Sequence, residues 1–544
     1  MGEERSNHAA ASPGASFDVV IVGGGFAGLY MLHRCRGLGL SARVFEAGSG
    51  VGGTWHWNRY PGARCDIESM EYSYQFSDEL QQEWEWTERY ATQPEILRYV
   101  NHVADRFDLR RDVQLDTRVL AAAFDETTSR WSVETDAGTV SARFVVMATG
   151  CLSSTNTPDF EGLERFSGAC YHTGRWPHEG VDFSGQRVGV IGTGSSAIQS
   201  IPHIAGQASH LFVFQRTPNY SVPAHNGPLT DERQRDVKQR YATFREANGQ
   251  MRLGFGSDTP ASEALAAEAT PEERHEVYEE RWQQGGLPFL GAFADLVSDE
   301  QANETAAEFV RDKIRAVVEN PAVADLLAPK QVLGCKRLCV DTGYYETFNR
   351  PNVTLVDVAT TPIEEITATG VRAGDTTYEL DAIVFATGFD AMTGALLNID
   401  IRGRGDTTLR EKWSAGPRAY LGLATAGFPN LFTVTGPGSP SVLSNMLPSI
   451  EQHVNWIADC LAHLRERGLD RIEPKPEAEE AWVAHVSEIA GETLYYGCNS
   501  WYLGANVPGK PRVFMPYIGF PEYVEKVNEI VANGYEGFDL TAAG

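Results

Sequence analysis

The sequence predicts an α/β protein with two parallel sheets and a block of helices inserted into the second. Two segments, 17–39 and 187–200, each join an apolar β-type run to a glycine-rich turn and a helical stretch. A strand that enters a helix through such a turn is typical of a Rossmann-like dinucleotide site. The segment 226–330 instead has helical propensity and charge pattern, without a clear strand. The expected fold class is α/β, with two Rossmann-like dinucleotide-binding domains and a helical insertion in the second.

The first glycine motif follows the apolar run Phe17–Val22. Gly23 permits a tight turn, Gly25 lets a pyrophosphate approach the backbone, and Gly28 lets the helix pack closely on the strand. The next β-type run ends in Glu46, roughly 20 residues after Gly25, which is the spacing expected of a carboxylate that binds ribose hydroxyls. Together these features favour a dinucleotide site over an ordinary glycine turn.

The second motif repeats this pattern after the apolar run Val188–Ile191. Its candidate cofactor-binding residues are Gly192, Thr193, Gly194, Ser195, Ser196 and Ala197. Ala197 stands at the third glycine position, where the motif tolerates alanine. The following strand-like run ends in Arg216, which cannot accept a hydrogen bond from a 2′-hydroxyl but can clamp a 2′-phosphate. We therefore expect NADP at this site, with a plain surface arginine as the less favoured interpretation.

Opposite residues at the two ribose positions indicate two different dinucleotides, and FAD in the first site with NADPH in the second is the simplest pair. Two further runs, VVMATG at 145–150 and IVFATG at 383–388, have the form of a late strand that returns the chain to one of the two sheets. The expected parts are a disordered tail over 1–16, an FAD-binding domain over 17–155 and 390–544, an NADPH-binding domain over 156–225 and 331–389, and a helical insertion over 226–330.

Local signals refine this outline in two places. Thr270, Pro271, Glu272 and Glu273 form a capping box with proline at the first helical position, which predicts a helix that begins at Pro271. The tryptophan-rich run 83–86 is more typical of packing than of a binding cage.

Charge and cysteine content narrow the partners and the compartment. Lys and Arg number 46 against 73 Asp and Glu, a formal net charge of −27, so neither nucleic acid nor an anionic membrane is an expected partner. The sequence contains no apolar run of 18 or more residues, so no membrane span is predicted. The eight scattered cysteines indicate reduced thiols in the cytoplasm. Cys335 and Cys339 could share a helix face, but no metal site is expected. The expected assembly is a monomer.

Between the two glycine motifs, Phe166, Gly168, His172, Trp176 and Pro177 match the pattern F-x-G-x-x-x-H-x-x-x-W-P. The segment resembles the fingerprint of Baeyer-Villiger monooxygenases, and residues 52–66 resemble the second fingerprint of that family. Flavin monooxygenases that oxidise nitrogen or sulfur carry Phe or Tyr where Trp176 stands, which favours ketone oxidation. The resemblance extends over about residues 17–540 and is greatest to members that oxidise phenylacetone, then to those that oxidise steroids.

The resemblance implies NADPH- and O2-dependent oxidation of ketones to esters or lactones through a C4a-peroxyflavin, on aryl-alkyl, linear, cyclic or steroid ketones. It assigns catalysis to Arg337, held by Asp66, because a guanidinium stays cationic where negative charge develops. His172 by itself is more typical of a core or linker histidine. The implied FAD-binding residues are Thr54, Trp55, Asp66, Tyr72, Val119 and Met446. The implied NADP-binding residues are Arg64, Arg216, Thr217, Lys336, Arg337 and Trp501, the last on a mobile loop. The implied substrate-pocket residues are Ser441, Val442 and Leu443.

Three other activities use parts of the same pattern. Flavin-dependent oxygenation at sulfur or nitrogen is the main alternative. A disulfide reductase shares both nucleotide folds but needs a redox-active C-x-x-C type pair near the flavin, which the sequence lacks. A non-catalytic NADPH-sensing protein would keep the glycine motifs without any need for Arg337 and Asp66. Ketone oxidation therefore remains the expected function.

Overall fold

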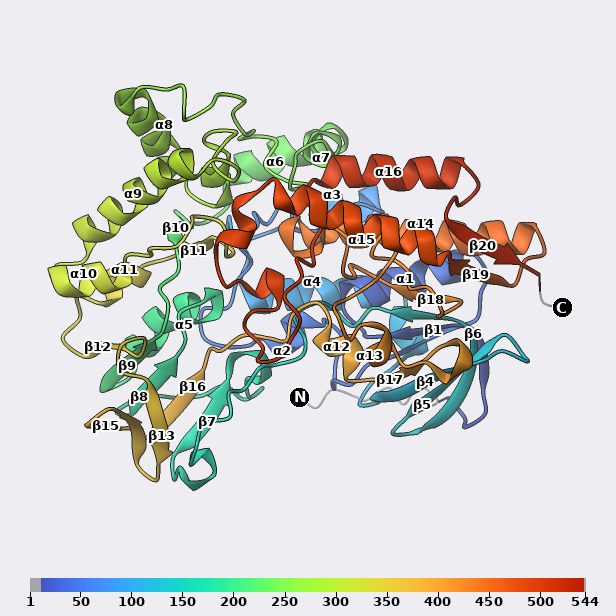
Figure 1. The fold of residues 1–544 in the computed structure, drawn as a ribbon, viewed down its shortest axis with the longest axis horizontal. Coiled ribbons are helices and arrows are strands. Elements are labelled where there is room, and N and C mark those ends of the chain that lie inside the picture. Colours follow the sequence, from blue (N-terminus) through green and yellow to red (C-terminus); the bar gives the residue numbers. More distant parts are fainter. Residues whose placement is uncertain (1–10, 543–544) are drawn as a thin grey trace.

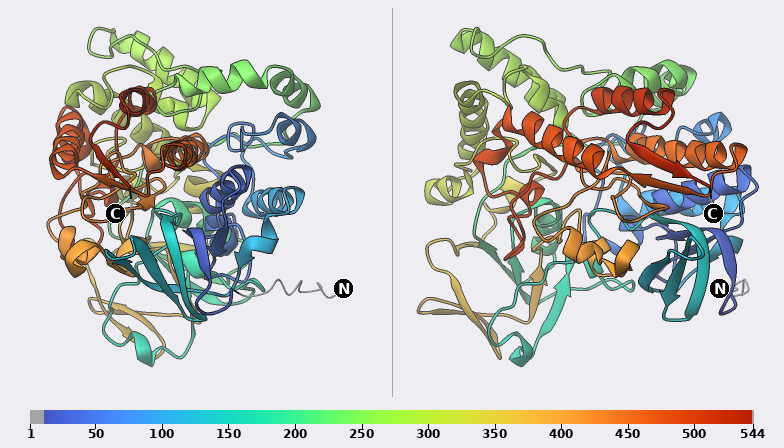
Figure 2. Two further views of the ribbon diagram at one scale, coloured as in Figure 1. Left: turned by 90° about the vertical axis from the view of Figure 1, so that its right-hand side faces the viewer. Right: turned by 45° about the vertical axis from the view of Figure 1, so that its right-hand side comes forward.

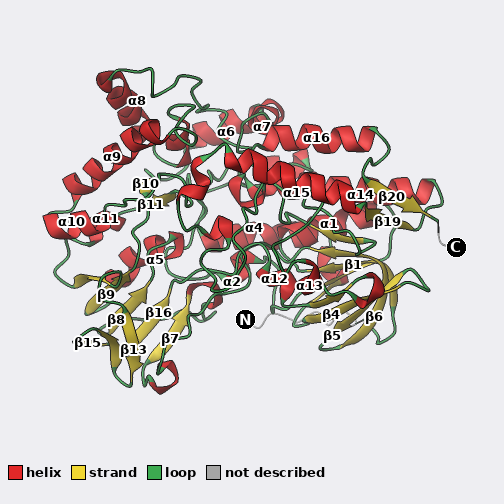
Figure 3. Cartoon of the chain, viewed as in Figure 1, coloured by secondary structure: helices red, strands yellow, loops and turns green. Residues whose placement is uncertain are grey.

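Both expected sheets are present in the computed structural model, which describes residues 11–542. In Figure 1 the strands of one sheet gather at the lower left and those of the other at the lower right. Most of the long helices lie above and between them, as the colours of Figure 3 show. The molecule therefore has two sheet units with helical layers packed across them.

The first unit is an eight-stranded mixed sheet in the order β17-β4-β5-β6-β1-β2-β3, with β18 paired to β6. Its strands are β1 Ser16–Val22, β2 Ala42–Phe45, β3 Val113–Gln114, β4 Val119–Asp125, β5 Arg130–Thr135, β6 Gly138–Met147, β17 Asp400–Arg402 and β18 Leu431–Thr433. β1 pairs in parallel with both β2 and β6. The VVMATG run therefore lies beside the first glycine motif, as predicted.

Five parallel strands form the second sheet, in the order β12-β9-β8-β16-β7. They are β7 Ala169–His172, β8 Arg187–Ile191, β9 His210–Gln215, β12 Val353–Asp357 and β16 Ala382–Phe385. β16 lies beside β8 with Phe385 opposite Ile191, so the IVFATG run also returns to its sheet as predicted. A small antiparallel sheet precedes β16 and comprises β13 Ile363–Thr367, β14 Gly370–Ala373 and β15 Thr376–Glu379.

The two ends of the helical insertion lie next to each other. β10, Ser221–Pro223, and β11, Cys339–Asp341, pair in parallel on either side of it. Its helices are α6 Asp231–Gln239, α7 Tyr241–Gly249, α8 Pro271–Gln284, α9 Glu300–Val317 and α10 Pro321–Leu327. α8 begins at Pro271 with the capping box of Thr270 and Glu273 in place, as predicted. α6, α7 and α8 lie at the top of both views in Figure 2.

Helices from both ends of the chain cover the first unit. α1, Phe26–Gly37, lies against α14, Met446–Glu466, where the Tyr30 hydroxyl donates to Asn455 at 2.7 Å. Elsewhere in the molecule, α5 Ser195–Ala205 and α11 Tyr344–Thr347 belong to the second unit. The remaining helices are α2 Thr54–Trp57, α3 Asp78–Glu83, α4 Gln93–Arg106, α12 Gly394–Leu397, α13 Leu409–Lys412, α15 Pro476–Gly491 and α16 Phe520–Ala532. β19, Arg471–Pro474, and β20, Phe538–Thr541, form an antiparallel pair. Within residues 11–542 no helix combines the length and apolar character that crossing a membrane requires.

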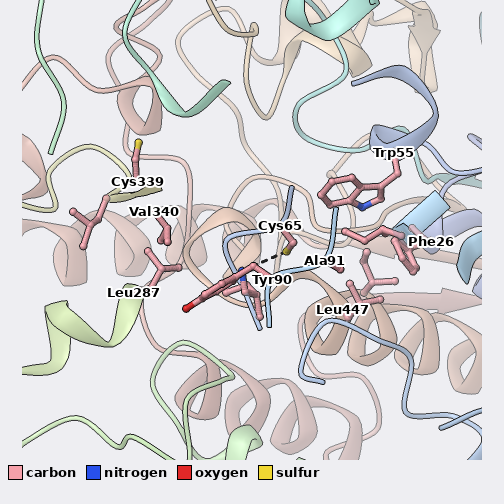
Figure 4. Packing of buried hydrophobic residues seen from close by; sticks show 14 of the residues in the cluster. Phe26, Trp55, Cys65, Tyr90, Ala91, Leu287, Cys339, Val340 and Leu447 are labelled. Atoms are coloured by element: carbon pink, nitrogen blue, oxygen red, sulfur yellow. Dashed lines mark hydrogen bonds between the residues drawn. The ribbon is translucent and has the colours of Figure 1, made fainter. Parts of the chain in front are cut away.

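One buried apolar cluster extends through both units and into the insertion. Figure 4 shows Phe26 and Trp55 on one side of it and Cys339 on the other, with Tyr90 between them. The tryptophans of the 83–86 run pack against the same cluster, which confirms their packing role. Because this core is shared, the two units are held in a defined relation to each other.

Residues 11–16 differ from the expected disordered tail. β1 already begins at Ser16, which pairs with Ser141, and the N–H of Gly14 donates to the carbonyl of Thr139 at 2.8 Å. These backbone hydrogen bonds order a segment whose polar composition gave no sign of structure. The rest of the expected tail, residues 1–10, lies outside the described residues.

Candidate active site

A cavity of about 1420 Å³ lies between the two glycine motifs. It is larger than the roughly 300–1,000 Å³ typical of pockets for one small molecule. The predicted site residues that line it are Gly23, Gly25, Glu46, Thr54, Trp55, Arg64, Asp66, Tyr72, Val119, Gly192, Thr193, Gly194, Ser195, Ser196, Arg216, Thr217, Lys336, Arg337, Val442, Met446 and Trp501. The structure thus brings both motifs, the second fingerprint and the basic pair to one space.

The other predicted residues lie behind the cavity wall. Gly28 and Ala197 are within α1 and α5, close to the preceding strands. Val442 is the member of the expected substrate group that lines the cavity, whereas the buried Ser441 hydroxyl points to the sulfur of Met392 at 3.4 Å. The residues that do not line it are Gly28, Ala197, Ser441, Leu443, Phe166, Gly168, His172, Trp176 and Pro177.

The first motif has a backbone conformation that only glycine allows. Gly23 has a φ of +109°, and a Cβ there would lie 2.5 Å from the carbonyl oxygen of Ala148. A Cβ on Gly28 would lie 1.8 Å from the carbonyl oxygen of Gly23. Gly25 precedes α1, and no side chain of the described residues caps this helix. Its first N–H groups are therefore available to an anion such as a pyrophosphate.

Glu46 follows β2 beside this turn, and its side chain is buried. One carboxylate oxygen accepts the N–H of Gly24 at 2.6 Å, and the other accepts the N–H of Gly48 at 2.7 Å. The carboxylate therefore tightens the glycine loop. Since each oxygen has two lone pairs, it also keeps acceptor capacity for a ribose hydroxyl.

The second motif has the same backbone frame. Gly192 has a φ of +115°, and a Cβ there would lie 2.4 Å from the carbonyl oxygen of Ala386. Ala197 occupies the third position and is completely buried. A Cβ on Gly194 would meet open space, and α5 begins directly after it without a side-chain cap from the described residues. This open cradle at a helix N-terminus fits the pyrophosphate of a second dinucleotide.

Two cations lie at the far end of the second motif. Arg216 is exposed and Lys336 half-buried, and both line the cavity. Burial and the neighbouring Arg216 lower the pKa of Lys336, and within residues 11–542 neither cation forms an ion pair. The carbonyl of Thr217 accepts the Thr193 hydroxyl at 2.8 Å, which ties this end of β9 to the glycine loop. Two uncompensated cations suit a 2′-phosphate. Arg64 is different, because it pairs with Glu88.

Asp66 and Arg337 meet between the two motifs. Arg337 Nε lies 3.4 Å from Asp66 Oδ2, and another guanidinium nitrogen donates to the carbonyl of Val442 at 3.4 Å. Burial raises the pKa of Asp66, although Arg337 opposes the rise. Burial opposes the charge on Arg337, but Asp66 prevails and raises the pKa of the guanidinium. Arg337 therefore stays cationic and keeps donors for a bound anion.

The C-terminal segment closes one side of the cavity, where half-buried Trp501 lies on the wall. Three residues earlier, Cys498 forms a disulfide with Cys335, with their Cα atoms 6.1 Å apart. The expectation that all eight cysteines are reduced is therefore wrong. Cys335 and Cys339 also share no helix face, because Cys339 begins β11. The spacing could not show the disulfide, since 163 residues separate its cysteines.

The five named residues of the first fingerprint do not line the cavity, although Gly174 between them does. His172 ends β7, and its Nδ1 accepts the N–H of Gly174 at 3.0 Å. Burial lowers the pKa of His172, so the ring is neutral. Trp176 is buried, whereas Gly174 lines the cavity. These contacts lie within the second unit and are those of a structural histidine.

The cavity-lining residues that were not predicted as site residues include Tyr60, Gln199 and Asn219. Gln199 contacts Asp66, and Asn219 donates to the backbone carbonyl of Arg337 at 3.3 Å. Gln199 is one helical turn beyond Ser195, so the 3.6-residue period could have placed it on the same face. No comparable signal marks Asn219, which lies in a loop after β9.

Comparison with known proteins identifies the family of the chain. Residues 20–250 match the pyridine nucleotide-disulphide oxidoreductase family. Over 529 residues the chain is 45% identical to a Baeyer-Villiger monooxygenase of Pseudooceanicola batsensis, with 96% of each chain covered. Over 530 residues it is 42% identical to a phenazine N-monooxygenase of Lysobacter antibioticus, with 96% of this chain and 97% of the relative covered.

Solved structures are similarly close. An oxidized steroid monooxygenase bound to NADP is 56% identical with a TM-score of 0.92, and the match covers 97% of this chain and 100% of that one. A complex of OTEMO with FAD and NADP is 39% identical with a TM-score of 0.93, at the same coverage. With such identities over nearly its whole length, the chain belongs to the Baeyer-Villiger monooxygenase family.

Proposed function

We propose that the chain is an FAD-containing, NADPH- and O2-dependent monooxygenase that oxidises ketones to esters or lactones. The contact between Asp66 and Arg337 carries this proposal, because it fixes a cation where the two dinucleotide sites meet. A ketone oxygen gains negative charge as a new bond forms at the carbonyl carbon. A partly buried guanidinium with spare N–H donors stabilises charge of that kind.

The residues of the first site fit FAD and those of the second fit NADPH. The uncapped end of α1 and the carboxylate of Glu46 would hold the FAD, with Trp55, Tyr72 and Met446 on the same wall. The second site offers the end of α5 and the two cations. When bound, FAD supplies the redox chemistry, since it accepts a hydride from NADPH and reacts with O2.

The chain's own side chains then have separate tasks. Arg337 binds the developing oxyanion, and Asp66 orients the guanidinium through Nε. Val442 lines the cavity and accepts from Arg337 through its carbonyl, so it places the substrate wall next to that cation. Trp501 and its segment exclude water, which would otherwise favour loss of the activated oxygen as hydrogen peroxide.

The test is identification of products by mass spectrometry after the flavin-loaded protein is incubated with NADPH, air, phenylacetone, cyclohexanone, progesterone and thioanisole. We expect an ester or lactone from at least one ketone. Arg337→Ala should reduce ester formation by about 10²–10³-fold, as loss of an oxyanion donor does elsewhere. The control is Arg404→Ala, which removes an exposed cation paired with Glu126. A wild-type rate of ester formation in Arg337→Ala would contradict the proposal.

Oxygenation at nitrogen or sulfur is the second candidate, because one similar relative is named as an N-monooxygenase. Trp176, the fingerprint residue that favours ketones, is buried and does not line the cavity, so its influence on the substrate is indirect. Sulfoxide from thioanisole, without ester from any ketone, would move the assignment to heteroatom oxygenation.

Disulfide reduction is less well supported. In the described part of the chain, neither Cys335 nor Cys498 lines the cavity, so the disulfide is not placed to receive electrons from a flavin bound there. The two cysteines also lack the C-x-x-C spacing of a redox-active pair.

We further propose the division into an FAD half over 17–155 and 390–544 and an NADPH half over 156–225 and 331–389. The support is that each half contributes strands to its own sheet. We set the ends of the insertion near 224 and 338 instead of 226 and 330, with the pairing of β10 and β11 as support. A monomeric, cytoplasmic enzyme stays a prediction from composition.

A further inference from the structure

A glutamine on the NADPH side is hydrogen-bonded to the carboxylate that faces Arg337. Gln199 lies on α5 and its side chain is nearly buried, with 9% exposed. Its Nε2 donates to Asp66 Oδ1 at 3.1 Å and to the carbonyl of Arg64 at 3.1 Å. Its Oε1 accepts the hydroxyl of Tyr60 at 2.8 Å. The side-chain hydrogen bonds of Gln199 therefore all reach the segment 60–66.

The amide of Gln199 has one favourable orientation. An ionised carboxylate only accepts, so the NH2 group must face Asp66. Burial raises the pKa of Tyr60 far above neutrality, so the phenol keeps its proton and donates to Oε1. Rotation of the amide by 180° would place its oxygen against the Asp66 carboxylate and its NH2 group against the N–H of Arg64, which now donates to Oε1 at 3.4 Å. The contact is therefore directional as well as close.

The backbone also locks this contact. Gly62 has a φ of +80°, and a Cβ there would lie 2.4 Å from the carbonyl oxygen of Gln199. The segment 60–66 of the FAD half thus lies directly against α5 of the NADPH half. α5 begins with Ser195 and Ser196, one turn before Gln199, at the expected pyrophosphate site.

We propose that Gln199 is a positioning residue that couples the NADPH-binding helix to the Asp66–Arg337 pair. It holds Asp66 Oδ1 so that Oδ2 faces the guanidinium, and it acts through Asp66 without contact to the ketone. This inference rests on the proposed function. It identifies one rigid route, a single turn of α5, between the bound NADP and the side chain that orients Arg337.

The decisive variant is Gln199→Met, which keeps the length of the side chain and removes its hydrogen bonds. Loss of a bond to a charged group should lower kcat for ester formation by about 10-fold. The KM for the ketone should change by less than about twofold. NADPH consumption should shift toward hydrogen peroxide. Because Asp66 loses a donor that favours its ionised form, the acidic limb of the pH profile should move to higher pH.

A double-mutant cycle separates positioning from mere packing. Gln199→Met and Asp66→Asn are combined, and both kcat and the free energy of unfolding of the apoprotein are measured. If Gln199 acts through Asp66, the two effects should be clearly less than additive in both measurements. Gln207→Met is the matched control, since that exposed glutamine just beyond α5 accepts only from the N–H of Phe183.

The outcomes separate this inference from the proposed function. Additive effects, or a Gln199→Met enzyme with the wild-type ester yield per NADPH and pH profile, would overturn the positioning role. A wild-type protein that makes no ester from any ketone would instead overturn the proposed function. Even then, the unfolding cycle measures the Gln199–Asp66 coupling, because it needs no substrate.

The disulfide supports a second inference on separate grounds. Cys335 directly precedes Lys336 and Arg337, and Cys498 lies three residues before Trp501. It thus links the loop of the two cavity cations to the segment that covers the cavity. Cys335 is buried and Cys498 half-exposed, so a reductant can reach the bond from the side of Cys498.

We propose that this disulfide is a reversible redox tether that restricts opening of the segment 494–503. Two thiols and one hydrogen peroxide give the disulfide and two waters. Hydrogen peroxide is the product when NADPH oxidation is uncoupled from a ketone. An external dithiol restores the two thiols by exchange, and its own sulfurs are oxidised. Oxidation would then tie down the segment that carries Trp501.

The experiment compares NADP⁺ release by stopped flow from the holoenzyme, oxidised with hydrogen peroxide or reduced with dithiothreitol. Release should be about 3–10-fold slower in the oxidised form, because opening of such segments often limits product release. Cys498→Ser should release NADP⁺ rapidly under both conditions, whereas Cys170→Ser, which alters an exposed free thiol, should behave like wild type. Equal rates in oxidised and reduced wild type, or no 335–498 cross-linked peptide after peroxide treatment, would overturn the tether.

Discussion

The two glycine motifs share a backbone frame and differ in the side chains attached to it. In each, a glycine of positive φ lies so close to the residue after the late strand that a Cβ would be within 2.5 Å of its carbonyl oxygen. That residue is Ala148 for Gly23 and Ala386 for Gly192. The frames are alike because close backbone approach tolerates no side chain. The third position and the ribose position differ, which shows that one backbone can serve two ligands.

The differences also concern how firmly each site is closed. At the first site Glu46 is buried and joined to two backbone N–H groups of the glycine loops. At the second, Arg216 is exposed and the described residues provide it with no ion pair. At the first site the ribose-position side chain is thus fixed by the protein, whereas at the second the ribose-position cation is free to pair with a ligand. From this contrast we expect a resident FAD and an exchanging NADPH.

The largest effect should come from the third position of the motifs. Gly28→Ala would place a Cβ 1.8 Å from the Gly23 carbonyl oxygen, so the first site must distort. We expect a loss of about 3 kcal/mol or more and purification without bound FAD. Ala197→Gly should cost only about 1 kcal/mol at the corresponding point of α5. Flavin absorbance and chemical unfolding measure both, and full FAD occupancy in Gly28→Ala would contradict the comparison.

The next effect concerns the exposed cation of the second site. Arg216→Ala should raise the KM for NADPH by about 10–100-fold, because a charge-assisted hydrogen bond to the 2′-phosphate is lost. The KM for NADH should hardly change. Steady-state kinetics with both nucleotides measure the difference. Arg187→Ala is the control, since Arg187 pairs with Asp381 on the same sheet. An equal change for NADPH and NADH would remove Arg216 from phosphate recognition.

Glu46→Gln should have a smaller effect. One carboxylate oxygen becomes an NH2 group that faces a backbone N–H, so one loop hydrogen bond is lost and a repulsive contact replaces it. The dissociation constant for FAD should rise by about 10-fold, while that for NADP⁺ should not change. Fluorescence of released FAD and calorimetry with NADP⁺ measure the two constants. A parallel loss of NADP⁺ affinity would show that the sites are not independent.

The smallest expected effect is on the pH dependence of the free energy of unfolding, and it comes from α14, which packs against α1 of the first site. Burial raises the pKa of Glu451 on α14 to about 7, although the N–H groups of Gln75 and Phe76 favour the charged form. The folded-state pKa exceeds the ordinary value of about 4.3, so the free energy of unfolding should fall as pH rises from about 4.5 to 7. α5 of the second site carries no acidic residue.

Glu451→Gln should flatten this pH dependence by on the order of 1 kcal/mol. Chemical unfolding of the apoprotein at pH 5 and pH 7.5 measures the change. Glu466→Gln, which alters an exposed glutamate at the end of the same helix, is the control. If wild type and Glu451→Gln showed the same slope between the two pH values, Glu451 would not titrate in this range.

Much of the fold was predictable because its signals are local. The strand, turn and helix of each motif, the returning ATG runs and the capping box at Thr270 all depend on residues close in sequence. The structure departs from expectation where a segment is ordered or bonded by a partner that is distant in sequence. Residues 14–16 are ordered by backbone hydrogen bonds to β6, and Cys335 forms a disulfide with Cys498, 163 residues away.

The sequence by itself determined the two glycine frames and the opposite charges of Glu46 and Arg216, because backbone sterics and short-range hydrogen bonds specify them. Tertiary structure alone decided the contact of Gln199 with Asp66. The contact of Asp66 with Arg337, 271 residues away, was expected from the family resemblance and from no local signal. No periodicity or propensity links residues so far apart. Packing of α5 against the segment 60–66 brings Gln199 to Asp66, and Asp66 then maintains the charge of Arg337 against the effect of burial.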